Sequence, residues 1–130
     1  MIAVDTNVLL RLILGDDPRQ LAAIRSVLAR TTIHVGPTVM LEAGWVLASR
    51  YRMNRSEVAD ALDAVLTLDG VDVAQRELIG WAVARYRAGA DWADMIHLTG
   101  ATKLDGFVTL DRRLARDARR HAPVPIETLT

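Results

Sequence analysis

The chain has 130 residues, which is enough for one domain and short for two. It is 51% hydrophobic and 25% charged, a balance that allows a buried core and excludes a disordered chain. The absence of cysteine excludes a disulfide scaffold, a zinc site with thiolate ligands and a cysteine nucleophile. Sixteen basic and sixteen acidic residues cancel, so binding to nucleic acid would require a local basic patch.

Two features of the sequence bear on location. The longest segment without Asp, Glu, Lys or Arg covers residues 31–41, well short of the roughly 20 residues that a membrane helix needs. No basic segment precedes an apolar one at the amino terminus, as a secretory signal would require. We therefore expect a cytoplasmic protein that has no contact with a membrane.

In chain order, the first half of the sequence predicts two strands and four helices. The strands are expected over residues 2–4, as a buried strand that ends in Asp5, and over residues 32–35. The helices are expected over residues 7–14, 18–30 and 38–51, and from Ser56 onward. Gly15 should end the first helix, Pro18 suits the first turn of the second, and Thr38 and Ser56 should begin the next two.

The second half continues the alternation of strands and helices. Strands are expected over residues 71–73, 107–110 and 124–129, and helices over residues 75–87, 91–104 and immediately after Asp111. Such alternation predicts an α/β fold with a mostly parallel central sheet and helices on both faces, formed by residues 1–130 as a single domain. The ligand site of such a sheet lies beyond the carboxyl ends of its strands.

Acidic residues follow two of these strands and occupy two of the helices. Asp5 and Asp111 each come directly after a strand, although either could simply cap the helix that follows. Glu42 has Val39, Trp45 and Val46 as helical neighbours, so it should lie on an apolar face. There it should be paired with an arginine such as Arg50 or Arg52, or bind a metal.

Asp91 and Asp94 lie three residues apart in the first turn of one predicted helix. The positive end of a helix favours either acid alone, whereas two carboxylates at this spacing repel each other. Leu98 and Ala101 continue the side of Asp94, so this acid should face inward. Hard oxygen ligands of this kind suit Mg²⁺ or Mn²⁺, and four of them in one cleft would need such a cation.

The chain resembles a PIN domain, and specifically a VapC-type toxin ribonuclease. The resemblance rests on four segments in order, MIAVDTNVLL, VMLEAGWVL, ADWADMIHLTGA and FVTLDRRLAR, and it covers nearly the whole chain. It implies a PIN-like, Rossmann-like three-layer sandwich. It also implies that Asp5, Glu42, Asp94 and Asp111 hold Mg²⁺ or Mn²⁺ and are catalytic, with Asp91 as an additional candidate ligand.

The activity implied by the resemblance is that of an endoribonuclease toxin in a toxin–antitoxin pair. It would hydrolyse RNA phosphodiester bonds with water that the metal activates, leaving 5′-phosphate and 3′-hydroxyl ends. Thr6, Asn7 and Thr109 would be polar supports for the acids, unless Thr6 and Asn7 simply begin a helix. The resemblance also implies a cognate VapB-type antitoxin that covers the cleft and inserts an arginine toward the acids.

Several other residues have two interpretations. The arginines after Asp111 either contact RNA phosphates or form a solvated helix face; they are Arg112, Arg113, Arg116, Arg119 and Arg120. His97 should be a packed histidine rather than a support for a metal ligand. Trp45, Trp81 and Trp92 should belong to the core rather than stack on bases.

Other assemblies and functions are also compatible with parts of the sequence. The apolar second helix and the region from Met40 to Leu47 offer apolar surface that favours a homodimer. A phosphoacceptor or a phosphohydrolase with an acidic site is an alternative. A phosphohydrolase would need an aspartate where the chain has Asn7, and a phosphoacceptor would need a lysine at the end of a strand, whereas Lys103 falls within a predicted helix. A non-catalytic PIN-fold interaction module would be expected to lack some of the acids, and this chain keeps all four.

Overall fold

A computed structural model of the chain describes residues 1–118 and 121–130. Its contacts divide the chain into two compact units, Met1–Arg76 and Glu77–Thr130, which are described one at a time. Seven helices and five strands occur in the described ranges, and every strand pair is parallel. This confirms the predicted α/β class, whereas the single-domain boundary remains a prediction.

The first unit is built on a three-stranded parallel sheet in the order β1-β2-β3. The strands are β1 (Ile2–Ala3), β2 (Ile33–Val35) and β3 (Val71–Val73). The predicted strand over residues 2–4 is shorter, although the Val4 N–H still donates to the His34 carbonyl. It is also exposed rather than buried, because β1 is an edge strand in this sheet and Ile2 is 44% exposed.

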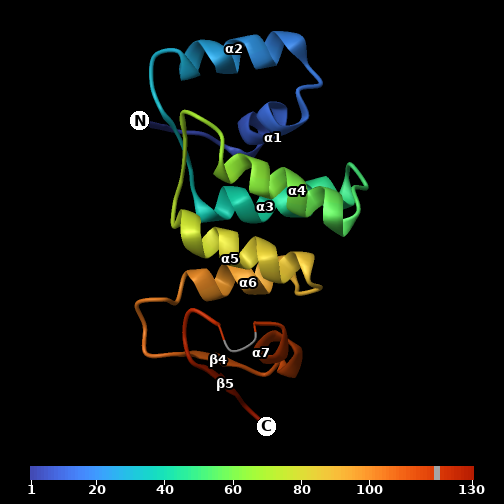
Figure 1. Cartoon of the computed structure of the whole chain (residues 1–130), viewed down its shortest axis with the longest axis vertical. Helices are drawn as coiled ribbons and strands as arrows, with labels where there is room; N and C mark the ends of the chain where they lie inside the picture. Colours follow the sequence, from blue (N-terminus) through green and yellow to red (C-terminus); the bar gives the residue numbers. More distant parts are fainter. Residues whose placement is uncertain (119–120) are drawn as a thin grey trace. The chain divides into compact units, whose positions relative to one another are not determined.

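Four helices complete the first unit (Figure 1): α1 (Thr6–Leu14), α2 (Pro18–Leu28), α3 (Pro37–Ser49) and α4 (Arg55–Leu66). Helix α3 packs against both α1 and α4, and α4 also packs against β3. Gly15 ends α1 in the left-handed conformation, and Pro18 occupies the first turn of α2, both as predicted.

Two helix starts differ from the prediction. Gly36 rather than Thr38 precedes α3, with Pro37 in its first turn and no side-chain cap. Helix α4 begins at Arg55 because Asn54 and Glu57 form a capping box, in which each side chain accepts the other residue's backbone N–H. The box starts the helix ahead of Ser56 by satisfying two N–H groups that would otherwise lack partners.

The second unit contains three helices and a two-stranded parallel sheet within the described residues (Figure 1). They are α5 (Arg76–Arg87), α6 (Trp92–Thr99), β4 (Phe107–Thr109), α7 (Arg112–Ala118) and β5 (Ile126–Thr128). Helix α6 is shorter than the predicted 91–104, since it ends at Gly100 and turns follow. The rings of Tyr86 and Trp92 meet edge to face at 5.8 Å and join α5 to α6.

Fully buried side chains give each unit an apolar core. In the first unit they include Leu9, Ile33, Met40, Leu47 and Leu62, and in the second Ile79, Met95 and Leu98. Of the described helices, none is both long and apolar enough to cross a membrane.

Candidate functional site

Asp5 links the first strand to the first helix. Its Oδ1 accepts the Val8 backbone N–H at 3.0 Å and thereby caps α1. The capping interpretation of this acid is therefore correct, but a cap uses only part of the capacity of a carboxylate that stays exposed. Thr6, next in the chain, is buried, whereas Asn7 is exposed.

Glu42 lies on the exposed side of α3, so its prediction on a buried apolar face is wrong. The buried stripe of α3 consists of Met40, Ala43, Gly44 and Leu47, which follow the i, i+3, i+4, i+7 spacing of a core-facing helix. Among the described residues, Glu42 makes no ion pair with Arg50 or Arg52. Its carboxylate is thus open to solvent and to a ligand.

A pocket of about 330 Å³ in the first unit includes Glu42 in its lining. The lining comes from α1, from α3 and from the residues just after α3, and includes Thr6, Asn7, Arg11, Trp45, Arg50 and Tyr51. Trp45 is 65% exposed, which contradicts its predicted place in the core. It lies one helical turn from Glu42 on the solvent side of α3.

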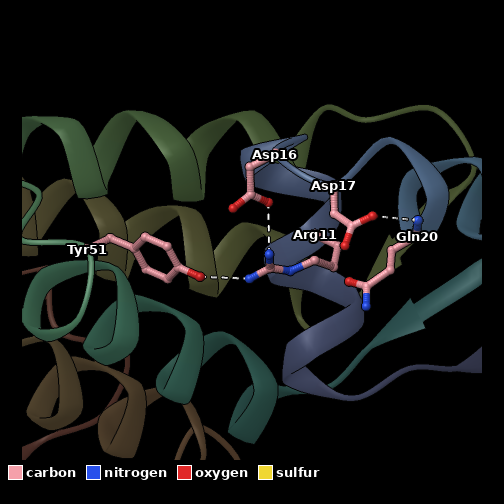
Figure 2. Close-up of polar contacts among 5 residues, drawn as sticks. All are labelled: Arg11, Asp16, Asp17, Gln20 and Tyr51. Atoms are coloured by element: carbon pink, nitrogen blue, oxygen red, sulfur yellow. Dashed lines mark hydrogen bonds and ion pairs between the residues drawn. The ribbon is translucent and has the colours of Figure 1, made fainter.

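Arg11 is held in place at this pocket by two partners (Figure 2). Its Nη2 donates to the Tyr51 hydroxyl at 2.7 Å, and its Nη1 pairs with Asp16 at 2.8 Å. The hydrogen bond to Tyr51 is the main cause that raises the pKa of Arg11 above its usual value. The bond also fixes the Tyr51 ring relative to α1, across 40 residues of sequence.

In the second unit, Asp91 and Asp94 share the first turn of α6. Oδ2 of Asp91 accepts the Asp94 backbone N–H at 3.0 Å, so Asp91 is the cap of the helix. Asp94 is half-buried, as the sequence predicts, and lies one turn before the fully buried Leu98. Ala101 is also buried, but it lies beyond the end of α6.

The carboxyl group of Asp94 lies in an unfavourable environment for a negative charge. Burial raises its pKa above the usual 3.8, and the nearby carboxylates of Asp91, Asp111 and Asp117 raise it further, while His97 lowers it. Asp94 and Asp111 therefore interact electrostatically, although they are separated by 17 positions in the sequence.

Asp111 is fixed by bonds on both sides of the turn between β4 and α7. Its backbone N–H donates to Oγ1 of Thr109 at 3.0 Å, and its Oδ1 accepts the Arg113 backbone N–H at 2.8 Å. Thr109 therefore holds the backbone that carries this acid, and its role as a support for a metal ligand remains a prediction.

The four predicted ligands are divided between the units, with Asp5 and Glu42 in the first and Asp94 and Asp111 in the second. Within the described part of the chain, no group of three or more acidic or histidine side chains is arranged to hold a metal ion. Within the second unit, the carboxylates of Asp91 and Asp111 both raise the pKa of Asp94. The shared site of all four acids therefore remains a prediction.

Comparison with protein families adds a decisive observation, because the PIN domain model matches residues 2–119. The chain belongs to the PIN domain family. This membership and the parallel α/β structure confirm the PIN-like fold expected from the sequence, which is a nuclease-type fold. A search of curated proteins found no significant match.

The remaining candidates of this PIN domain have mixed outcomes. Arg112, Arg113 and Arg116 are exposed, with Arg116 3.7 Å from Asp117, while Arg119 and Arg120 lie outside the described residues. His97 is exposed, so its prediction as a packed histidine is wrong. Trp92 is buried as predicted. Trp81 is half-buried, and its Nε1 has no hydrogen-bond partner among residues 1–118 and 121–130.

The pocket beside Glu42 is a feature of this PIN domain that the sequence interpretation missed. That interpretation gives no role to Arg11 or Tyr51 and assigns Trp45 to the core. A signal exists, since Trp45 and Ser49 follow Glu42 at i+3 and i+7, which places them along one side of α3. Because α3 is apolar on almost every side, the sequence alone does not distinguish this exposed side from the buried one.

Proposed function

We propose that this PIN domain is a metal-dependent endoribonuclease of the VapC toxin type. The observation that carries the proposal is the ordered set of four acids, Asp5, Glu42, Asp94 and Asp111, in a chain that matches the PIN domain model over residues 2–119. Asp5 and Asp111 keep acceptor sites free for a ligand, because each uses one carboxylate oxygen to accept a backbone N–H. The Glu42 carboxylate is exposed.

The donor set fits Mg²⁺ or Mn²⁺. All four ligands are hard carboxylate oxygens, which these ions prefer, and the crowded acids around Asp94 would be relieved by a positive charge. When bound, such an ion would activate water toward an RNA phosphodiester and neutralise charge that develops on the phosphoryl oxygens. The proposal requires all four carboxylates to share the ion.

Other residues would position these ligands or the RNA. Thr109 would hold Asp111 through the backbone, and Asp91 would orient the first turn of α6, which carries Asp94. Arg112, Arg113 and Arg116 directly follow Asp111 in the chain and are exposed, so they could bind RNA phosphates close to that acid.

The proposed partners are an antitoxin and a second copy of the chain. A VapB-type antitoxin would neutralise the enzyme by placing an arginine against the acids, so coexpression with the antitoxin should lower nuclease activity. For the homodimer, α2 is the part of the expected surface that remains, because Ile24 is its one buried residue, whereas Met40 and Leu47 are fully buried within the first unit.

The experiment that tests the activity is an RNA cleavage assay with three arms: added Mn²⁺, excess EDTA, and the Asp5→Asn variant purified in parallel. Cleavage in Mn²⁺ that is lost in both other arms would support the proposal. Cleavage that persists in Asp5→Asn would identify a contaminating nuclease or a different site. A protein with no cleavage in any arm would favour a non-catalytic module.

A further inference from the structure

The pocket beside Glu42 carries features that the four acids do not explain. Trp45 and Tyr51 are large aromatic side chains with 65% and 40% of their surface exposed, and both line the same pocket. A tryptophan so exposed on a helix that has a well-formed buried stripe contributes little to the core. Most of its surface is therefore open to a ligand in this pocket.

Two arginines give this pocket positive charge. Arg11 is partly neutralised by Asp16 at 2.8 Å, and its geometry is fixed by Tyr51. Arg50 is exposed and forms no side-chain hydrogen bond or ion pair within the described residues of the first unit. An arginine of this kind can form two parallel hydrogen bonds to a phosphate without breaking an existing contact.

The size and lining of the pocket match a nucleotide. Its volume of about 330 Å³ lies at the lower end of the range for small-molecule sites. Aromatic faces next to a free guanidinium are the elements with which proteins bind unpaired nucleotides, by base stacking and phosphate contact. Asn7, exposed on α1, adds amide groups that can pair with a base edge.

We propose that this pocket is a subsite for one unpaired nucleotide of the RNA substrate, with its base stacked on Trp45 and its phosphate bound by Arg50. The subsite rests on the proposed function, because Glu42 in the lining would repel a phosphate unless a cation neutralises it. Trp45 and Glu42 are one turn apart on α3, so the bound nucleotide would lie next to Glu42. Trp45 would favour unpaired RNA over a duplex, whose bases are already stacked.

The test measures RNA binding rather than cleavage. The background is Glu42→Gln, which removes the lining carboxylate, and the buffer contains EDTA. Fluorescence anisotropy measures the binding of fluorescein-labelled hexauridylate and hexaadenylate to the Glu42→Gln protein. The same titrations are made with three double variants, in which Glu42→Gln is combined with Trp45→Leu, with Trp45→Phe or with Arg50→Gln. A labelled RNA duplex and the exposed Arg30→Gln substitution serve as controls, and circular dichroism verifies the fold of each variant.

The subsite predicts that Trp45→Leu weakens binding of at least one hexamer by about 5- to 100-fold, that Trp45→Phe restores most of it, and that binding of the duplex is unaffected. Arg50→Gln should reduce the slope of log affinity against log salt by about 0.7, and Arg30→Gln should leave it unchanged. Equal hexamer affinities with and without Trp45, or no hexamer binding at all, would overturn the subsite. Cleavage by the unmodified protein in Mn²⁺ decides the proposed function separately.

Discussion

The carboxylate of Asp91 accepts the backbone N–H of Asp94 at 3.0 Å, so the two acids are held in the same first turn of α6. The bond and the helix dipole stabilise the charge on Asp91. The environment of Asp94 disfavours a negative charge, because burial and the surrounding carboxylates raise its pKa. One helix start therefore contains one favourable and one unfavourable negative charge.

In metal-free protein, we expect Asp94→Asn to raise the midpoint of thermal unfolding at pH 7. The pKa of Asp94 is higher in the folded than in the unfolded chain, so the folded state binds more protons and loses stability as the pH rises through this range. The amide removes that loss. The advantage of Asp94→Asn should therefore shrink as the pH falls toward the usual carboxyl pKa of 3.8.

The control for this experiment is Asp69→Asn, an isosteric change at an exposed aspartate in the first unit. It should leave the midpoint nearly constant relative to the unmodified protein across the same pH series. A lower midpoint for Asp94→Asn at pH 7 in EDTA would show that the carboxylate is favourable where it lies, which is the opposite of the expected result.

Two substitutions at Asp5 separate its cap from its proposed role as a ligand. Asparagine is as good a helix cap as aspartate, so Asp5→Asn should change the free energy of unfolding by less than about 0.5 kcal/mol, whereas Asp5→Ala should cost about 1 kcal/mol. Both variants should lose metal-dependent RNA cleavage. Urea denaturation and the cleavage assay measure the two effects, and full activity of Asp5→Asn would reduce Asp5 to a cap.

Thr109 is expected to act as a positioning residue through Asp111. Thr109→Val keeps the β-branched shape in β4 and removes the hydroxyl that accepts the Asp111 N–H. We expect a 10- to 100-fold loss of Mn²⁺ affinity, which Thr109→Ser should largely restore. Titration of Mn²⁺ by calorimetry is the measurement, with circular dichroism as a check of folding; an unchanged affinity would mean that the hydroxyl serves the turn alone.

The sequence predicted the order of strands and helices well, because glycine, proline and apolar periodicity act locally. Gly15 and Pro18 lie where a left-handed residue ends α1 and a first-turn proline begins α2. The start of α4 and the end of α6 were predicted less well. The box between Asn54 and Glu57 competes with Ser56 as a start, and Gly100 ends α6 although apolar residues continue beyond it.

The environment of the acids could be predicted only in part. Asp94 is half-buried as expected, because Leu98, one turn further along the same side of α6, is fully buried. Helix α3 has apolar residues nearly all round, so Val39 and Met40 mark equally plausible core faces in the sequence. Packing against α1 and α4 selects the stripe that includes Met40, and Glu42 and Trp45 become exposed.

The central claim is that Asp5, Glu42, Asp94 and Asp111 bind one divalent ion, and Mn²⁺ titration by calorimetry tests it most directly. The unmodified protein is compared with Asp5→Asn from the first unit and Asp94→Asn from the second, with Asp69→Asn as the control. The account predicts that either substitution at a proposed ligand removes the same binding event, while the control retains it. If Asp5→Asn binds Mn²⁺ with unchanged affinity and stoichiometry, the shared site is contradicted.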